Sequence, residues 1–196
     1  MPGQGEQAAE VLEFWFVQSR PRQWFAKDPA FDALLRERFL ALTRQALAGE
    51  LDAWGTGPTG GLALVLLLDQ FPRQIWRDTA MAFASDPQAL ALSLKAVERG
   101  WLEAEPEQAR RQFWLMPLMH AEDLDLQHEC VRRFQRLLDT CPPELEDTLA
   151  RHLHFAELHR DIVARFGRFP HRNAALGRPG TPAEAAFLQN GPRFGQ

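Results

Sequence analysis

The stretch that decides the fold spans residues 60–73 and reads GGLALVLLLDQFPR. It is apolar on nearly every side, which is typical of a central helix covered by its neighbours. A buried strand is the competing interpretation by length alone. Only Val65 is β-branched and no partner strand is apparent elsewhere, so we favour a helix that ends in the polar run Asp69–Arg73.

Helix signals continue outward from this stretch in both directions. Asp28-Pro29, Ser85-Asp86-Pro87 and Thr181-Pro182 each place a capping side chain before a proline that suits the first helical turn. Gly49 is expected to end the first of these helices. A last long helix is expected at about Glu144–Phe166. Its core-facing stripe is predicted to consist of His152, Phe155, His159, Ile162 and Phe166. The pattern predicts an all-α protein.

Length and charge limit the class of protein. The 196 residues, 45% of them apolar, fit one domain over 1–196 with a substantial core. The net charge of −4 argues against nucleic-acid binding. Leu62–Leu68, the longest apolar run, is too short to cross a membrane, and no secretory signal is visible at the N-terminus. We therefore expect a cytoplasmic protein, with Cys130 and Cys141 as reduced thiols.

The stretch Arg165–Asn173 is the most informative for function. It reads RFGRFPHRN, so arginine, histidine and asparagine side chains surround a glycine and a proline. Arginine offers forked donors to carboxylate or phosphate, whereas proline stops the preceding helix. This composition indicates that polar side chains are held in fixed positions.

Three strings of the sequence carry a resemblance to a known family. They are LDQFPR at 68–73, PLMHAED at 117–123, and FGRFPHRN at 166–173 followed by LGR at 176–178. With the aromatic N-terminal block and TPAE at 181–184, they resemble the bacterial domain of unknown function 924 family over nearly the whole chain. The resemblance implies a tetratricopeptide-like array of antiparallel helices and no particular activity. Ala121 stands where the family often has serine.

The candidate site draws on all three strings. Its predicted ligand-binding residues are Asp69, Arg73, His120, Glu122, Asp123, Arg168, His171, Arg172 and Asn173. A small anionic molecule could accept bidentate hydrogen bonds there, and an enzyme could use His120 or His171 as acid or base. The competing interpretation is structural: the two carboxylates cap a helix, while the arginines fasten the last loop to acidic residues.

Other chemistry finds less support in the sequence. His152 and His159 lie about two turns apart, too far to bind one ion, and HExxH is absent, so no metal or other cofactor is expected. No nucleophile motif is present either. The alternative function is a peptide- or protein-binding module, in which the motifs serve structure alone. Whether the protein is an enzyme stays open at this point.

Overall fold

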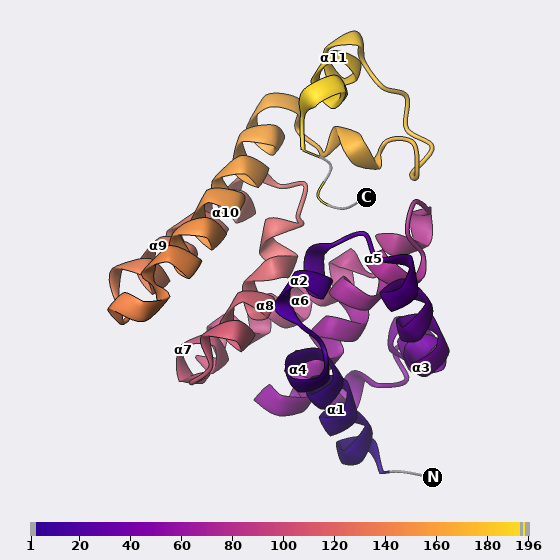
Figure 1. Ribbon diagram of the computed structural model, residues 1–196, viewed down its shortest axis with the longest axis vertical. Coiled ribbons are helices and arrows are strands. Elements are labelled where there is room, and N and C mark those ends of the chain that lie inside the picture. Colours follow the sequence, from indigo (N-terminus) through magenta and orange to yellow (C-terminus); the bar gives the residue numbers. More distant parts are fainter. Residues whose placement is uncertain (1–2, 193, 195–196) are drawn as a thin grey trace. The chain divides into compact units, whose positions relative to one another are not determined.

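The computed structural model describes residues 3–192 and 194, and every regular element among them is helical (Figure 1). The all-α prediction is confirmed. The chain divides into two compact units. Unit 1 takes in the described residues of Met1–Trp114 and Pro192–Gln196, and unit 2 is Leu115–Gly191. One domain over 1–196 stays a prediction.

Unit 1 contains both short and longer helices. In chain order its elements are α1 (Gln4–Glu13), η1 (Phe14–Gln18), α2 (Pro21–Phe25), α3 (Pro29–Leu47), η2 (Asp52–Thr56), α4 (Pro58–Val65), η3 (Leu66–Gln70), α5 (Phe71–Ile75), η4 (Ala80–Ala82), α6 (Asp86–Glu98), α7 (Trp101–Ala104) and the first part of α8 (Gln108–Met119).

The predicted central helix is present as the continuous run α4–η3–α5. Leu62–Leu68 and Phe71 are all buried there, as a helix covered on every side requires. α4 lies against α1, and α5 lies against α3. At Gly60 a Cβ atom would come within 2.6 Å of the Trp54 carbonyl oxygen, so only glycine allows this close approach.

Local signals set the predicted helix starts with one exception. The Asp28 side chain accepts hydrogen bonds from the N–H groups of Ala30 and Phe31 at 3.0 and 3.2 Å, so α3 starts as expected. α6 also starts where expected, but the Ser85 side chain does not cap it. The Ser85 hydroxyl instead donates to the Leu68 carbonyl at 2.6 Å.

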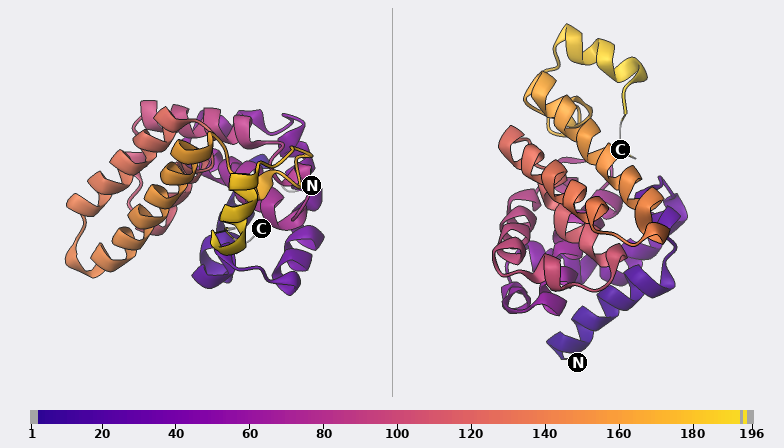
Figure 2. Two further views of the ribbon diagram at one scale, coloured as in Figure 1. Left: turned by 90° about the horizontal axis from the view of Figure 1, so that it is seen from above. Right: turned by 90° about the vertical axis from the view of Figure 1, so that its left-hand side faces the viewer.

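Unit 2 is built around one helical hairpin. Its elements are the end of α8, α9 (Leu124–Asp139), η5 (Pro143–Leu145), α10 (Glu146–Phe166), η6 (Pro170–Arg172) and α11 (Pro182–Asn190). α9 and α10 run side by side in opposite directions in both views of Figure 2. Cys130 and Phe134 on α9 are fully buried.

The buried face of α10 differs from the predicted stripe. It consists of Leu149, Leu153, Ala156, His159, Ile162 and Val163. Phe155 is 48% exposed, so its placement in the core was wrong. α10 ends at Phe166, and Gly167 takes the left-handed conformation, φ +69°, that favours glycine. The chain then turns into η6, which carries the polar stretch.

Candidate functional site

Seven of the nine predicted site residues lie in unit 2, on two connecting segments. His120, Glu122 and Asp123 follow α8, while Arg168 and the His171–Asn173 group lie between α10 and α11. Asp69 and Arg73 belong to unit 1. A pocket that joins all three motifs therefore stays a prediction.

Asp123 is a helix cap. Its carboxylate accepts a hydrogen bond from the Leu126 N–H at 3.0 Å and so starts α9. The Asp123 residue is exposed, and this bond accounts for its position in the motif. The capping interpretation thus fits Asp123 but not its neighbour Glu122.

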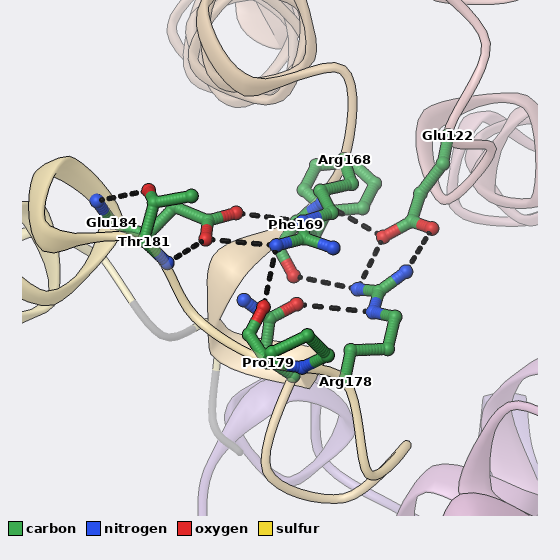
Figure 3. A network of polar contacts seen from close by, with 8 residues as sticks. Glu122, Arg168, Phe169, Arg178, Pro179, Thr181 and Glu184 are labelled. Atoms are coloured by element: carbon green, nitrogen blue, oxygen red, sulfur yellow. Dashed lines mark hydrogen bonds and ion pairs between the residues drawn. The ribbon is translucent and has the colours of Figure 1, made fainter.

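Glu122 instead holds the last loop through Arg178 (Figure 3). Its two carboxylate oxygens accept from the Arg178 guanidinium at 2.6 and 2.9 Å, and one of them also accepts from the Phe169 N–H at 2.7 Å. Arg178 further donates to the Phe169 carbonyl at 3.1 Å and to the Asn173 side-chain oxygen at 3.0 Å. These bonds tie both ends of η6 to the end of α8 within unit 2.

The pKa of Glu122 reflects this network. Partial burial raises it, but hydrogen bonds from Arg178 and Phe169, together with the positive charges of Arg172 and Arg178, outweigh burial and leave it below its ordinary value. Glu122 is therefore an ionised partner of arginine rather than a proton donor.

Arg168 forms a second, separate ion pair, with Glu184 of α11. Its Nε and Nη2 atoms donate to the two Glu184 oxygens at 2.7 and 2.9 Å, and Nη2 also reaches the Pro179 carbonyl at 2.8 Å (Figure 3). Glu184 completes the capping box with Thr181: the Thr181 N–H donates to Glu184 at 2.7 Å, and the Glu184 N–H donates to the Thr181 hydroxyl at 3.2 Å. Arg168 thus stabilises the start of α11.

These bonds determine the charge state of Glu184. The hydrogen bond from Arg168 is the largest cause, followed by the one from the Thr181 N–H, and the pKa of Glu184 falls to about 2. Because the carboxylate stays ionised, it cancels the charge of Arg168. Only 2% of Glu184 is exposed.

His171 and Arg172 lie against the Phe169 ring, as does one further histidine, His159 of α10, and His120 lies beside His159. We call His120, His159, His171 and Arg172 the histidine cluster. The Arg172 guanidinium lies 4.6 Å from the centre of the Phe169 ring, and its Nη2 donates to the His120 carbonyl at 3.0 Å. Ring centres are 6.2 Å apart for His120 and His159, 5.5 Å for His159 and Phe169, and 5.6 Å for Phe169 and His171.

His159 is neutral in this cluster. Burial is the largest cause of its lowered pKa, followed by the charge of His120, and the charges of Arg172 and His171 act in the same direction. The Phe155 carbonyl opposes them, but the pKa falls to about 3. Nδ1 of His159 lies 2.7 Å from that carbonyl oxygen, which only accepts, so Nδ1 carries the ring proton. Nε2 is then the ring's lone-pair nitrogen.

In unit 1, the buried Asp69 and Arg73 form a triad with the half-buried Asp86. Arg73 Nη1 lies 3.2 Å from the Asp69 carboxylate and 3.0 Å from the Asp86 carboxylate, and Nη2 donates to Asp86 at 3.0 Å. Asp69 is fully buried and also accepts from the Gln70 side chain at 2.5 Å. Burial lowers the pKa of Arg73, but the two carboxylates outweigh it and raise the pKa above its ordinary value. One guanidinium thus balances two carboxylates.

Sequence reasoning missed several members of these networks. Arg178, Glu184 and Asp86 were not in the predicted site, although the first two belong to the quoted strings, and Thr181-x-x-Glu184 is a recognisable capping box. His159 was predicted to face the core and was considered as a metal ligand, but it was not placed in the site. Its partners are His120, 39 residues before it, and His171, 12 residues after it. No local sequence pattern predicts contacts between residues so far apart in the chain.

Two further findings concern metals and membranes. Within residues 3–192 and 194, no three His, Cys, Asp or Glu side chains are grouped so that they could hold a metal ion. None of the helices in that part of the chain is both long enough and apolar enough to cross a membrane.

Comparison with known proteins gives a family and a structural neighbour. Residues 11–192 match the model of a family described as "Bacterial protein of unknown function (DUF924)". The protein of unknown function ATU0120 from Agrobacterium tumefaciens has a solved structure similar to this one. The two chains are 41% identical, with a TM-score of 0.85, over 96% of this chain and 100% of the other. No curated protein matches the chain.

Proposed function

Since this chain belongs to the bacterial family of proteins of unknown function DUF924, we propose that unit 2 binds a small anionic ligand through His120, His171 and Arg172. The ligand is a carboxylate or phosphate compound. The observation that supports this most is that the half-buried His171 imidazole and the buried Arg172 guanidinium both lie against the Phe169 ring, while the carbonyl of the half-buried His120 accepts from that guanidinium.

The electrostatics of the cluster favour an anion. His159 lies among these three groups, and each of them makes its protonation less favourable. A positive potential that repels a proton from His159 attracts a negative charge to the same place. Glu122, the nearby carboxylate, is already paired with the Arg178 guanidinium. The Arg172 guanidinium, which stays charged, is the group of the cluster that would attract an anion.

The arrangement also suits recognition because its parts are fixed. Arg172 is 6% exposed and hydrogen-bonded to the backbone of the segment that carries His120, and Phe169 is held by Glu122 and Arg178. Side chains already fixed lose little conformational freedom when a ligand binds. In an enzyme of this kind, His120 or His171 is the group that would give or take a proton, because an imidazole can do both.

Inorganic phosphate is a suitable probe. Imidazole ¹H–¹⁵N spectra of the full chain follow all six histidines during a phosphate titration, and we expect changes at His120 and His171 but not at the exposed His128 and His154. In His171→Asn we expect phosphate affinity to fall about tenfold or more, as for loss of one charge-assisted hydrogen bond. His154→Asn, on the surface of α10, is the matched control.

Two results would overturn the proposal. One is unchanged phosphate affinity in His171→Asn when urea unfolding shows the variant to be as stable as the wild type. The other is a set of spectral changes at His128 and His154 equal to those at His120 and His171, which would indicate weak binding all over the surface.

The alternative is a tetratricopeptide-like module that binds a peptide. It is supported by the antiparallel α9–α10 hairpin, because paired helices are the unit of such arrays, and by the exposure of Phe155 and Leu124 at 48% and 39%. Phe155→Ser tests it: a peptide ligand that uses this surface loses affinity in the variant, and phosphate binding at the histidine cluster is unchanged. A peptide bound equally well by Phe155→Ser would exclude this surface.

A further inference from the structure

A hollow lies in unit 2, lined by none of the residues of the histidine cluster. Its volume is about 470 Å³, and it is lined by Arg165, Phe166, Arg168, Thr181, Ala183 and Glu184. None of the residues assigned to phosphate binding above is among them. Ligand sites for small molecules usually measure about 300–1,000 Å³, so this hollow is large enough for a compound with one aromatic ring.

One wall is aromatic and carries a cation. The Phe166 and Phe187 rings lie 5.2 Å apart and join α10 to α11. The Arg165 guanidinium lies 4.7 Å from the centre of the Phe166 ring and 5.9 Å from that of Phe187. A guanidinium near an aromatic face is attracted to it, so Arg165 and Phe166, which both line the hollow, place a cation beside an aromatic ring.

Arg165 differs from Arg168 in its charge balance. Arg168 is neutralised by Glu184 through two hydrogen bonds. Arg165, by contrast, makes no hydrogen bond or ion pair with any residue that the structure describes. The hollow therefore has two guanidinium groups and one carboxylate, which leaves one positive charge without an internal partner among the described residues.

Two further lining residues, Thr181 and Glu184, are held in place, and Thr181 offers a donor. Thr181 and Glu184 are locked in the capping box of α11, and Glu184 is also held by Arg168. The Thr181 hydroxyl oxygen accepts from the Glu184 N–H, so its own proton is available to an acceptor in the hollow.

We propose that this hollow binds an aromatic anion, an aryl phosphate or an aromatic carboxylate. The anionic group pairs with the Arg165 guanidinium and accepts from the Thr181 hydroxyl, and the ring packs against Phe166. The site is independent of the histidine cluster, because it shares no side chain with it.

Phenyl phosphate is the probe that distinguishes this site from the first one. Calorimetry on the full chain compares it with inorganic phosphate in the wild type, Arg165→Gln and Arg151→Gln. Arg151 is an exposed control on the same helix, where its guanidinium donates to the Thr148 hydroxyl at 3.1 Å. We expect phenyl phosphate to bind more tightly than phosphate, and its affinity to fall about tenfold or more in Arg165→Gln alone.

The variant His171→Asn separates the two proposals. Phenyl phosphate binding that persists in His171→Asn and is lost in Arg165→Gln supports the hollow, whatever happens to inorganic phosphate. Binding that is kept in Arg165→Gln overturns the inference, and so does phenyl phosphate affinity no higher than that of phosphate. Arg165 is exposed and makes no polar bond with the described residues, so its replacement leaves folding intact, which a thermal unfolding curve verifies.

Discussion

Acid should destabilise unit 2 through His159, and the size of the effect follows from its environment. The folded-state pKa is about 3, against an ordinary value of 6.5 that applies to the unfolded chain. The folded protein thus disfavours the protonated imidazole. Above pH 6.5 the lowered pKa has no effect on stability, because the imidazole is neutral in both the folded and the unfolded protein. As the pH falls from 6.5 towards 3, unfolding is accompanied by binding of a proton, so the free energy of unfolding decreases.

The expected loss at pH 5 is about 2 kcal/mol. Linkage gives about 1.4 kcal/mol for each pH unit below the unfolded-state pKa, and pH 5 lies about 1.5 units below it. Because the folded-state pKa lies well below pH 5, the folded imidazole is almost entirely neutral there. The penalty at this pH therefore depends on protonation of the unfolded chain alone.

The assay compares urea unfolding of the wild type and His159→Gln at pH 7 and pH 5. All six tryptophans lie in unit 1, so unit 2 is followed by far-ultraviolet circular dichroism and by amide hydrogen exchange in α10. We expect the free energy of unfolding to fall by about 2 kcal/mol more in the wild type than in His159→Gln when the pH is lowered from 7 to 5. The pKa of His152 is also lowered, to about 4, mainly by burial, but His152 is present in both proteins and its effect cancels.

The surface variant His154→Gln should keep the pH dependence of the wild type. Equal losses in the wild type and His159→Gln would refute the reasoning, because they would mean that His159 is protonated in the folded state at little cost. The His159 side chain, which is 5% exposed in the structure, would then have to become accessible to water in solution.

Three further substitutions test the structural networks by urea unfolding. Asp123→Ala removes the cap of α9 and should cost about 1 kcal/mol, whereas Asp123→Ser should cost much less; equal losses would contradict capping. Arg178→Ala leaves Glu122 without its guanidinium and should cost about 1–3 kcal/mol, and a loss below about 0.5 kcal/mol, the level of an ordinary surface substitution, would show that the loop is held without it. Arg73→Met removes the guanidinium that lies between two carboxylates of unit 1 and should cost about 3–5 kcal/mol at pH 7, with partial recovery in acid. A loss that does not lessen in acid would argue against a charge effect.

The fold was predictable from sequence where the signals were local. Asp28-Pro29 and Thr181-Pro182 set helix starts because the cap and its acceptor lie within one turn. Ser85 carried the same signal, yet its hydroxyl bonds to Leu68, because a partner from another helix can compete with a local N–H. Phe155 was misplaced for a related reason: periodicity gives the faces of a helix, but which face is covered depends on what packs against it.

The site was predictable in composition but not in pairing. Arg168 and Arg172 were expected to need acidic partners, with Asp69, Glu122 and Asp123 as candidates, whereas Arg178 was not considered. In the structure, Glu122 pairs with an arginine 56 residues away, and Glu184 pairs with Arg168, 16 residues away. Nothing in either local sequence distinguishes these partners, because an ion pair has no requirement for spacing along the chain.

The pairing also decides which substitutions can report on a ligand. Arg168, Arg172 and Arg178 each donate to groups within unit 2, so replacing any of them disturbs the fold as well as any bound anion. Loss of binding in those variants would therefore not separate a site from a structural support. Arg165 makes no such bond among the described residues, and its guanidinium rests on two aromatic rings. A change of affinity in Arg165→Gln at unchanged stability is thus attributable to contact with the ligand.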